Sequence, residues 1–169
     1  MTYALTQKIQ ELKREFITVL AEKYPTVKIE NIPFVTNSRL KRAAGRVEWN
    51  KATLAIRKVD FSICLFSRYP ENLRSTFVHE LAHIVQIKTM GYTDHGSYFK
   101  AIMASLGETP RTHHQMEVKR KIYAYKCGCG QDHKIKIVRH NKIQRRQAAY
   151  RCQTNGQRID HTTPYVRVS

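Results

Sequence analysis

The sequence predicts an α+β protein in which helices flank a group of short strands and a small β appendage follows. Apolar residues recur at helical spacing near the start of the chain and again between residues 73 and 85. Short runs of alternating apolar and polar residues, typical of half-buried strands, lie between residues 33 and 66 and again beyond residue 121. With 169 residues, the chain is long enough for one core domain and a small second one. We expect the larger domain to cover residues 1–112 and the β appendage residues 113–169.

An amphipathic helix is predicted over residues 3–23. Its apolar side chains recur every three or four residues, at Leu5, Ile9, Leu12, Phe16 and Leu20. Tyr24-Pro25 ends the pattern, because proline cannot continue a helix. We interpret this helix as a packing element.

Short strands are predicted next. After an isolated Val35, alternation predicts strands at residues 46–49, 53–57 and 61–66, with a turn at Asn50-Lys51. Trp49, the only tryptophan, is interpreted as a core residue, and so is Cys64. The basic loop of Arg39, Lys41 and Arg42 fits either a phosphate contact or a solvated turn.

A motif that can bind a metal lies in the next predicted helix. Leu73, Phe77, Leu81, Ile84 and Val85 form an apolar stripe, and two histidines, at 79 and 83, fall on another. Histidines four residues apart on a helix lie on one face and can bind one metal ion, and imidazoles suit Zn²⁺. The glutamate between them, Glu80, can take a proton from a water on that ion.

Spacing discriminates among candidates for a third ligand. The metzincin pattern requires a glycine and a histidine where this chain has Gln86 and Thr89, so that class is excluded. Glu108 and Glu117 remain candidates, although Glu108 lies in a helix-end setting beside Gly107 and Pro110. The third candidate is His95.

The segment around His95 favours it as the third ligand. Gly91 is placed to end the first helix, and Asp94 is placed to cap a second helix. The apolar positions of that second helix are Phe99, Ile102, Met103 and Leu106. His95 would then lie in its first turn, after a connection short enough for the chain to fold back toward the metal. This geometry favours His95 over Glu108.

The C-terminal region is predicted to be two metal-binding turns joined by a hairpin, as in a zinc ribbon. Strands are expected at residues 121–126 and 134–137, a turn at 140–142, and a returning segment at 147–151. Cys127-Gly128-Cys129-Gly130 follows the first strand, and its glycines allow the backbone to wrap closely around a metal.

The second turn of this region departs from the ribbon pattern. Cys152 is followed three residues later by Asn155, where a ribbon has a second cysteine, and asparagine is a poor zinc ligand. His133 could complete a Cys₃His site with Cys127, Cys129 and Cys152. The alternative is a ribbon without metal that is held by packing. The pair His113 and His114 is interpreted as surface histidines, because adjacent positions do not face one way.

Charge is strongly basic and unevenly distributed. The formal net charge is +17; residues 117–169 contribute +10 and the preceding 116 residues +7. This asymmetry favours a polyanionic partner, most simply DNA or another nucleic acid, over a merely soluble basic surface. No apolar run reaches membrane-spanning length and the start lacks a signal-peptide pattern, so we expect a cytoplasmic protein with no membrane contact.

Taken together, these motifs resemble the SprT-like metalloprotease family, which includes Spartan. The resemblance spans nearly the whole chain and is carried by His79-Glu80-Leu81 with His83, Asp94-His95-Gly96, Phe99-Lys100, Met103 with Leu106-Gly107, and the stretches 43–49 and 63–65. The tail, with Tyr125, Cys127, Cys129, residues 139–141 and residues 150–152, resembles the zinc-ribbon tail of the bacterial SprT branch. The resemblance implies a zincin-like domain in which His79, His83 and His95 bind Zn²⁺ and Glu80 is the catalytic base. It also implies proteolysis linked to DNA.

Three hypotheses for function follow. The first is a zinc-dependent endopeptidase that cleaves DNA-associated or DNA-crosslinked proteins. The second is a basic nucleic-acid-binding protein whose zinc site is structural and closed by a fourth protein ligand such as Glu108. The third is a regulatory protein that keeps the pocket without turnover; the intact Glu80 argues against it, since a structural site needs no base.

Overall fold

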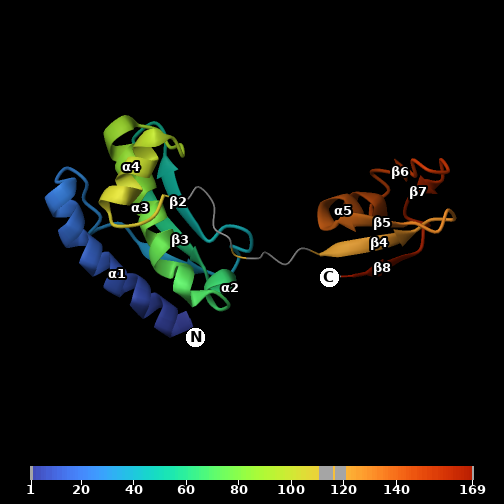
Figure 1. Ribbon diagram of the computed structural model, residues 1–169, viewed down its shortest axis with the longest axis horizontal. Helices are drawn as coiled ribbons and strands as arrows, with labels where there is room; N and C mark the ends of the chain where they lie inside the picture. Colours follow the sequence, from blue (N-terminus) through green and yellow to red (C-terminus); the bar gives the residue numbers. More distant parts are fainter. Residues whose placement is uncertain (1, 111–115, 117–120, 169) are drawn as a thin grey trace. The chain divides into compact units, whose positions relative to one another are not determined.

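The computed structural model describes residues 2–110, 116 and 121–168. The chain divides into two compact units, Met1–Met116 and Glu117–Ser169, here called the N-terminal and C-terminal units (Figure 1). The sequence placed the division slightly earlier, between residues 112 and 113. His113, His114 and Glu117, which were interpreted from the sequence, lie outside the described residues.

The N-terminal unit combines a three-stranded sheet with helices. In chain order its elements are α1 (Thr2–Lys23), β1 (Phe34–Asn37), β2 (Gly45–Asn50), β3 (Ala55–Ser62), α2 (Ile63–Phe66), a 3₁₀ turn (Pro70–Asn72), α3 (Leu73–Met90) and α4 (Ser97–Ser105). The strand order is β1-β3-β2, with β1 parallel and β2 antiparallel to β3. Strand β2 therefore lies at an edge of the sheet. The helix predicted at residues 3–23 is confirmed, and so is the helix predicted from the apolar stripe between Leu73 and Val85 and ended by Gly91.

A cluster of phenylalanines joins helices and sheet in the core. Phe77 of α3 lies 5.7 Å from Phe16 of α1, 5.1 Å from Phe34 of β1 and 5.6 Å from Phe61 of β3, measured between ring centroids. All four side chains are at most 3% exposed. This packing holds α3 against one face of the sheet, which fixes the helix that carries His79 and His83 relative to β2.

Three predictions for residues 53–66 are wrong. The strand predicted at 61–66 ends at Ser62, where the chain turns into α2, because the Ser62 hydroxyl accepts a hydrogen bond from Leu65 N–H at 3.1 Å and caps that short helix. Residues 51–54 form a turn, so β3 is one continuous strand from Ala55. Cys64 is partly exposed rather than buried, and its Sγ accepts a hydrogen bond from Arg68.

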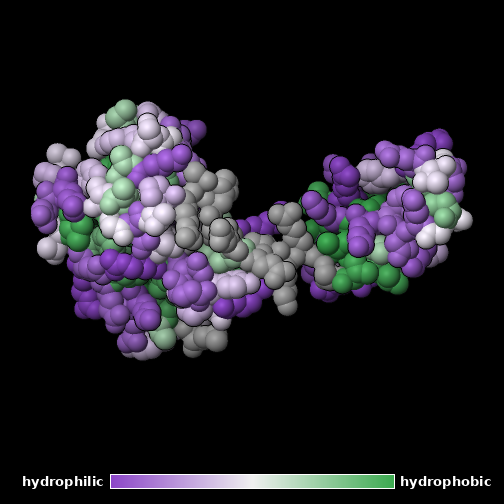
Figure 2. Space-filling view, in the orientation of Figure 1, coloured by the Kyte–Doolittle hydropathy of each residue, from purple (hydrophilic) through white to green (hydrophobic). Residues whose placement is uncertain are grey.

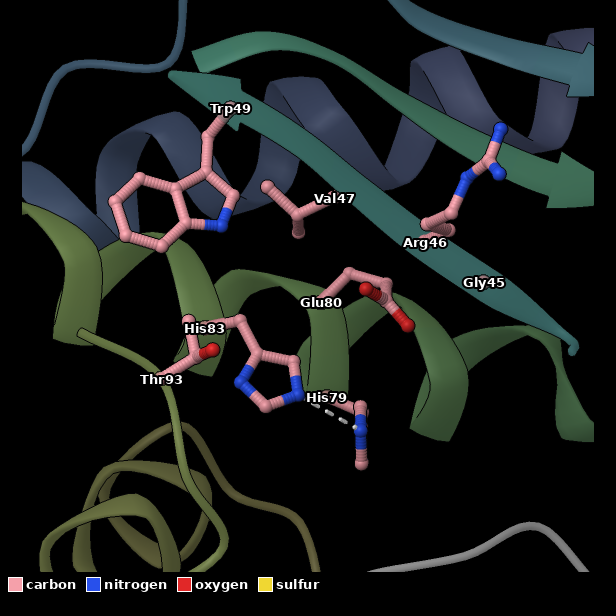
Figure 3. Close-up of a pocket in the computed structure, with 8 residues that line it drawn as sticks. All are labelled: Gly45, Arg46, Val47, Trp49, His79, Glu80, His83 and Thr93. Carbon is pink, nitrogen blue, oxygen red and sulfur yellow. Dashed lines mark hydrogen bonds between the residues drawn. The ribbon is translucent and has the colours of Figure 1, made fainter. Parts of the chain in front are cut away.

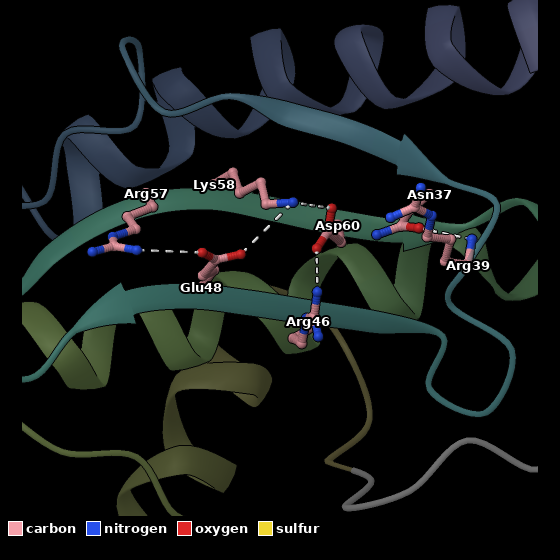
Figure 4. Close-up of polar contacts among 7 residues, drawn as sticks. All are labelled: Asn37, Arg39, Arg46, Glu48, Arg57, Lys58 and Asp60. Atoms are coloured by element: carbon pink, nitrogen blue, oxygen red, sulfur yellow. Dashed lines mark hydrogen bonds and ion pairs between the residues drawn. The ribbon is translucent and has the colours of Figure 1, made fainter.

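The sheet face opposite α3 carries paired charges (Figure 4). Asp60 is 1% exposed there, and its carboxylate bonds Arg46 Nη2 at 2.8 Å and Lys58 Nζ at 3.0 Å. A register shift in β2–β3 beside Glu48 leaves both Arg57 and Lys58 3.7 Å from its carboxylate. Buried charge on this face is therefore compensated by partly exposed cations.

The C-terminal unit is a small β structure with one helix. Its elements are β4 (Ile122–Lys126), β5 (Asp132–Lys136), α5 (Ile137–Gln144), β6 (Tyr150–Arg151), β7 (Arg158–Ile159) and β8 (Tyr165–Arg167). An antiparallel sheet has the order β5-β4-β8, and β6 pairs with β7. The predicted strands at 121–126 and 134–137 are confirmed apart from their ends.

The turn predicted at residues 140–142 is wrong, because these residues belong to α5. His140 and Ile143 lie three residues apart on the buried side of that helix, 7% and 0% exposed. The ring of His140 stacks on Tyr123 at a centroid distance of 3.5 Å, and His140 Nδ1 bonds Tyr125 Oη at 2.8 Å. The polar residues 140–142 indicated a turn in the sequence, but the His140 side chain is buried in the unit.

Candidate metal centres

Three imidazoles converge in the N-terminal unit. His79 and His83 lie one turn apart on α3, and His95 comes from the loop before α4. His79 Nε2 is 3.2 Å from both His83 Nε2 and His95 Nε2. Ligand nitrogens at 2.0–2.1 Å from a tetrahedral zinc ion are about 3.3 Å apart, so this spacing fits one shared ion. The structure thus brings together the three residues predicted as ligands.

The other candidates for a third ligand lie elsewhere. Among the described residues, this group of potential ligands contains the three histidines and no carboxylate. Glu108 instead lies 3.7 Å from Arg74 Nε, in an ion pair. Three protein ligands are the number found in catalytic zinc sites, where water or substrate takes the fourth position.

The loop that carries His95 differs from its prediction in one respect. Gly91 ends α3 with φ of 75°, in the left-handed conformation, as predicted. Asp94 was predicted to cap the next helix with His95 in its first turn, but the cap is Gly96 and α4 begins at Ser97. The Asp94 carboxylate accepts a hydrogen bond from Gly96 N–H at 3.0 Å and so holds a turn before the helix.

The ring of Phe99 packs against all three imidazoles. Its ring centroid is 4.9 Å from that of His79 and 4.8 Å from those of His83 and His95. Burial, assisted by the nearby His95, lowers the pKa of His83 to about 4. A neutral imidazole with a free nitrogen lone pair is the form that binds a metal.

Glu80 lies on the α3 side that faces β2. It is 5% exposed, and its carboxylate accepts a hydrogen bond from the Val47 backbone N–H. Burial raises the pKa of Glu80 to about 8, and that hydrogen bond opposes the rise. A carboxyl pKa close to the operating pH suits a group that both takes up and gives back a proton.

A pocket of about 260 Å³ lies between β2 and α3 (Figure 3). Its lining comes from both elements and from the loop after α3: Gly45, Arg46, Val47, Trp49, His79, Glu80, His83 and Thr93. Trp49 was interpreted as a core residue, which is wrong, since it is partly exposed and lines this pocket. The β2 contribution was missed in the sequence, although a glycine inside a strand is a signal for close approach of another group.

Gln86 was also missed as a site residue. It lies one turn after His83 on α3 and is 0% exposed. Its Oε1 is 3.3 Å from His83 Nδ1, and its Nε2 donates to Asp94 Oδ1 at 2.8 Å. The available signal was a polar side chain in an otherwise apolar run of the helix.

The C-terminal unit brings together a second group of potential ligands. Cys127, Cys129, His133 and Cys152 offer ligand atoms that lie within 4.8 Å of one another. Cys129 Sγ is 3.7 Å from Cys152 Sγ, and sulfurs at 2.3 Å from a tetrahedral zinc ion are about 3.8 Å apart. His133 Nε2 is buried without a hydrogen-bond partner in the described structure, which an ion bound there would supply.

Asn155, at the position where a zinc ribbon has its fourth cysteine, contacts the cysteine group through its backbone. Its backbone N–H donates to Cys152 and, together with hydrogen bonds from Thr154 N–H, Cys127 and Cys129, lowers the pKa of that thiol to about 6, although burial opposes the effect. A thiol with this pKa is largely thiolate at neutral pH, the form that binds metal. Gln157 Oε1, unnoticed in the sequence, accepts hydrogen bonds from Gly128 N–H at 2.7 Å and from Cys127 Sγ at 3.2 Å.

Comparison with known proteins places these features in a family. The model of the SprT-like family matches residues 5–122. The chain is 32% identical to Protein SprT of Vibrio parahaemolyticus over 137 residues, which cover 78% of this chain and 79% of that protein. It is 34% identical to Protein SprT of Vibrio atlanticus over 136 residues, 77% and 78% of the two chains.

Higher identity occurs over a shorter stretch. Protein SprT of Actinobacillus succinogenes is 42% identical over 80 residues, which cover 44% of this chain and 46% of that protein. In that comparison the chain therefore spans about half the length of its relative.

Proposed function

Because this chain belongs to the SprT-like family, we propose that it is a zinc-dependent endopeptidase and that its substrates are DNA-associated or DNA-crosslinked proteins. The observation that carries the proposal is the convergence of His79, His83 and His95 beside the buried Glu80. Three neutral imidazoles and a carboxylate base are the residue set of a hydrolytic zinc site.

The residues divide the chemistry among them. A zinc ion held by the three histidines would supply Lewis-acid chemistry toward a peptide carbonyl and an acidified water. Glu80 takes the proton of the attacking water and delivers it to the leaving amine nitrogen. Val47 N–H holds the Glu80 carboxylate in place for both transfers.

Edge strand β2 suits the binding of an extended substrate. It lies at the edge of the sheet and lines the pocket beside His79 and His83. A peptide added along such an edge gains backbone hydrogen bonds, while pockets receive its alternate side chains. A substrate in this position would bring its peptide bond to the histidines.

The C-terminal unit is proposed to bind DNA. Its charge is +10, and hydrophilic side chains cover much of the face in Figure 2. Exposed basic residues surround it: Lys121, Lys126, Lys134, Lys136, Arg139, Lys142, Arg145, Arg146, Arg151, Arg158 and Arg167. Tyr165 is 40% exposed and its ring stacks on Tyr125, which suits contact with a base. We propose that Zn²⁺ at Cys127, Cys129, His133 and Cys152 stabilises this unit.

The membrane plays no part in this proposal. Among the described residues, no helix is both long and apolar enough to cross a bilayer. We propose a cytoplasmic location, in which the thiols of the C-terminal unit stay reduced.

The alternative is a nucleic-acid-binding protein with a structural zinc site. A structural site is closed by four protein ligands, and the ion pair of Glu108 with Arg74 favours the open, catalytic site over this alternative.

A cleavage assay separates the two functions. A DNA-binding protein is incubated as substrate with the wild-type chain or with Glu80→Gln. Each mixture is prepared with and without DNA, and with and without a chelator. We expect cleavage by the wild type, loss with chelator, and loss in Glu80→Gln despite unchanged zinc content. Zinc binding without cleavage in any arm would support the structural alternative.

A further inference from the structure

A buried amide links a metal-binding histidine to the loop that carries another. Gln86 of α3 contacts His83 on its own helix and Asp94 in the loop, next to His95. Residues 92–96 of this loop are exposed, whereas Gln86 on α3 is fully buried. A fully buried amide requires partners for both of its ends, and here each end has one.

Hydrogen bonding fixes which way the amide faces. The Gln86 NH₂ group points to the Asp94 carboxylate, which can only accept. The Asp94 backbone N–H, which can only donate, lies 3.4 Å from the other end, Gln86 Oε1. Both contacts require the same orientation, so Oε1 faces His83 Nδ1 at 3.3 Å.

This orientation sets the tautomer of His83. A carbonyl oxygen can only accept, so Nδ1 must carry the proton, and Nε2 keeps its lone pair. Nε2 is the atom that lies 3.2 Å from His79 Nε2 in the candidate metal site. The partner of the second imidazole nitrogen fixes ring orientation and tautomer in metal sites generally.

We propose that Gln86, held by Asp94, is a positioning residue that presents His83 Nε2 to the metal and fastens the His95 loop to α3. The inference rests on the proposed metal site but requires no cleavage. One side chain then sets the geometry of two ligands that come from different segments.

The experiment measures metal affinity in the full chain without substrate. Zinc is titrated in competition with a chromophoric chelator, and Co²⁺ absorption follows the two sites separately, because thiolate ligands give charge-transfer bands that imidazoles lack. For Gln86→Leu we expect affinity at the histidine site to fall about tenfold to a hundredfold, with the cysteine site unchanged.

Tyr98→Phe is the matched control. Tyr98 Oη lies 3.2 Å from Thr89 Oγ1 and so links α4 to α3 on the far side of the same loop. This variant should keep wild-type metal affinity.

A second pair of variants covers the case in which Gln86→Leu does not fold. Asp94→Asn keeps an oxygen that can accept from Gln86 and should bind metal nearly as the wild type does. Asp94→Ala removes that acceptor and should weaken binding.

Equal affinity for Asp94→Ala and Asp94→Asn, or unchanged affinity in a folded Gln86→Leu, overturns the inference. A wild-type chain that binds metal at the histidines but cleaves nothing would contradict the proposed function and leave the affinity test valid. A wild-type chain that binds no ion at the histidines overturns both.

Discussion

Gly45 of β2 lies directly against the carboxyl group of Glu80 of α3. A Cβ placed on Gly45 would come within 2.7 Å of the Glu80 carboxyl carbon, closer than real Cβ contacts allow. The neighbouring Val47 donates its N–H to the same carboxylate. Glu80 is therefore positioned by the backbone of the edge strand, and a side chain at Gly45 would displace it.

Gly45→Ala should impair catalysis while keeping the metal. The added methyl group pushes Glu80 away from Val47 N–H, and general base catalysis contributes about 10²–10⁴-fold to rate. We expect kcat to fall at least about tenfold, with zinc stoichiometry and affinity unchanged. Steady-state cleavage and a zinc titration on the same preparation measure both. Wild-type kcat in this variant would show that Glu80 tolerates displacement and is not held as described.

Asp60→Asn should destabilise the N-terminal unit in a pH-dependent way. Burial acts to raise the pKa of Asp60, but hydrogen bonds from Arg46, Lys58 and Asn37 outweigh it and leave that pKa below its usual range. A lowered native pKa contributes stability above the unfolded-state pKa of about 3.9, and this contribution is lost as pH falls through the native value.

We expect Asp60→Asn to lower the free energy of unfolding by about 2 kcal/mol at pH 7. The difference from wild type should shrink below about pH 3.9. Urea unfolding at a series of pH values measures it. A difference that stays constant across the acidic range would mean that Asp60 ionisation does not contribute to stability.

Cys152→Ser should unfold the C-terminal unit without affecting the histidine site. Cys127 and Cys152 belong to the small core of this unit, with Tyr125, Ile143 and Ile159. So small a core is marginal without a metal or similar support. We expect loss of one zinc equivalent and of the unit's thermal transition, whereas Cys64→Ser, outside the cluster, should change neither. Two retained zinc equivalents in Cys152→Ser would contradict a thiolate site.

Binding of DNA should depend steeply on salt. Each phosphate contact by a lysine or arginine releases a counterion, so the logarithm of affinity falls linearly with the logarithm of salt concentration. Replacing both Lys134 and Lys136, which are exposed on β5, by glutamine should lower affinity and reduce that slope by about 2. Fluorescence anisotropy at several salt concentrations measures it. Arg57→Gln, on the N-terminal unit, is the control and should leave the affinity for DNA unchanged. A flat salt response of the wild-type chain would exclude an electrostatic nucleic-acid site.

Helices α1, α3 and α4 were predictable because their determinants are local. The apolar spacing of α3 and the glycine at 91 appear in the sequence at the positions that the structure uses. The histidine set could be inferred for the same reason, since His79 and His83 share a helix and His95 follows after a short loop. The cysteine group could be inferred because the turns that carry Cys127, Cys129 and Cys152 were expected to lie close together.

The pocket and its supports could not be predicted, because they depend on contacts between distant segments. Trp49 lines the pocket because β2 is the edge strand, which only the strand order β1-β3-β2 reveals. Asp94 reads as a helix cap, but its carboxylate is engaged by Gln86 on another element. His140 lies in a polar stretch, and its burial follows from stacking on Tyr123.

Anomalous diffraction from crystals of the zinc-loaded chain shows directly whether the three histidines share one ion. We expect a zinc peak about 2.0–2.1 Å from the Nε2 atoms of His79, His83 and His95, with a non-protein ligand completing the shell beside Glu80. A peak bound by His79 and His83 with the ring of His95 turned away, or one closed by a fourth protein side chain, would contradict it.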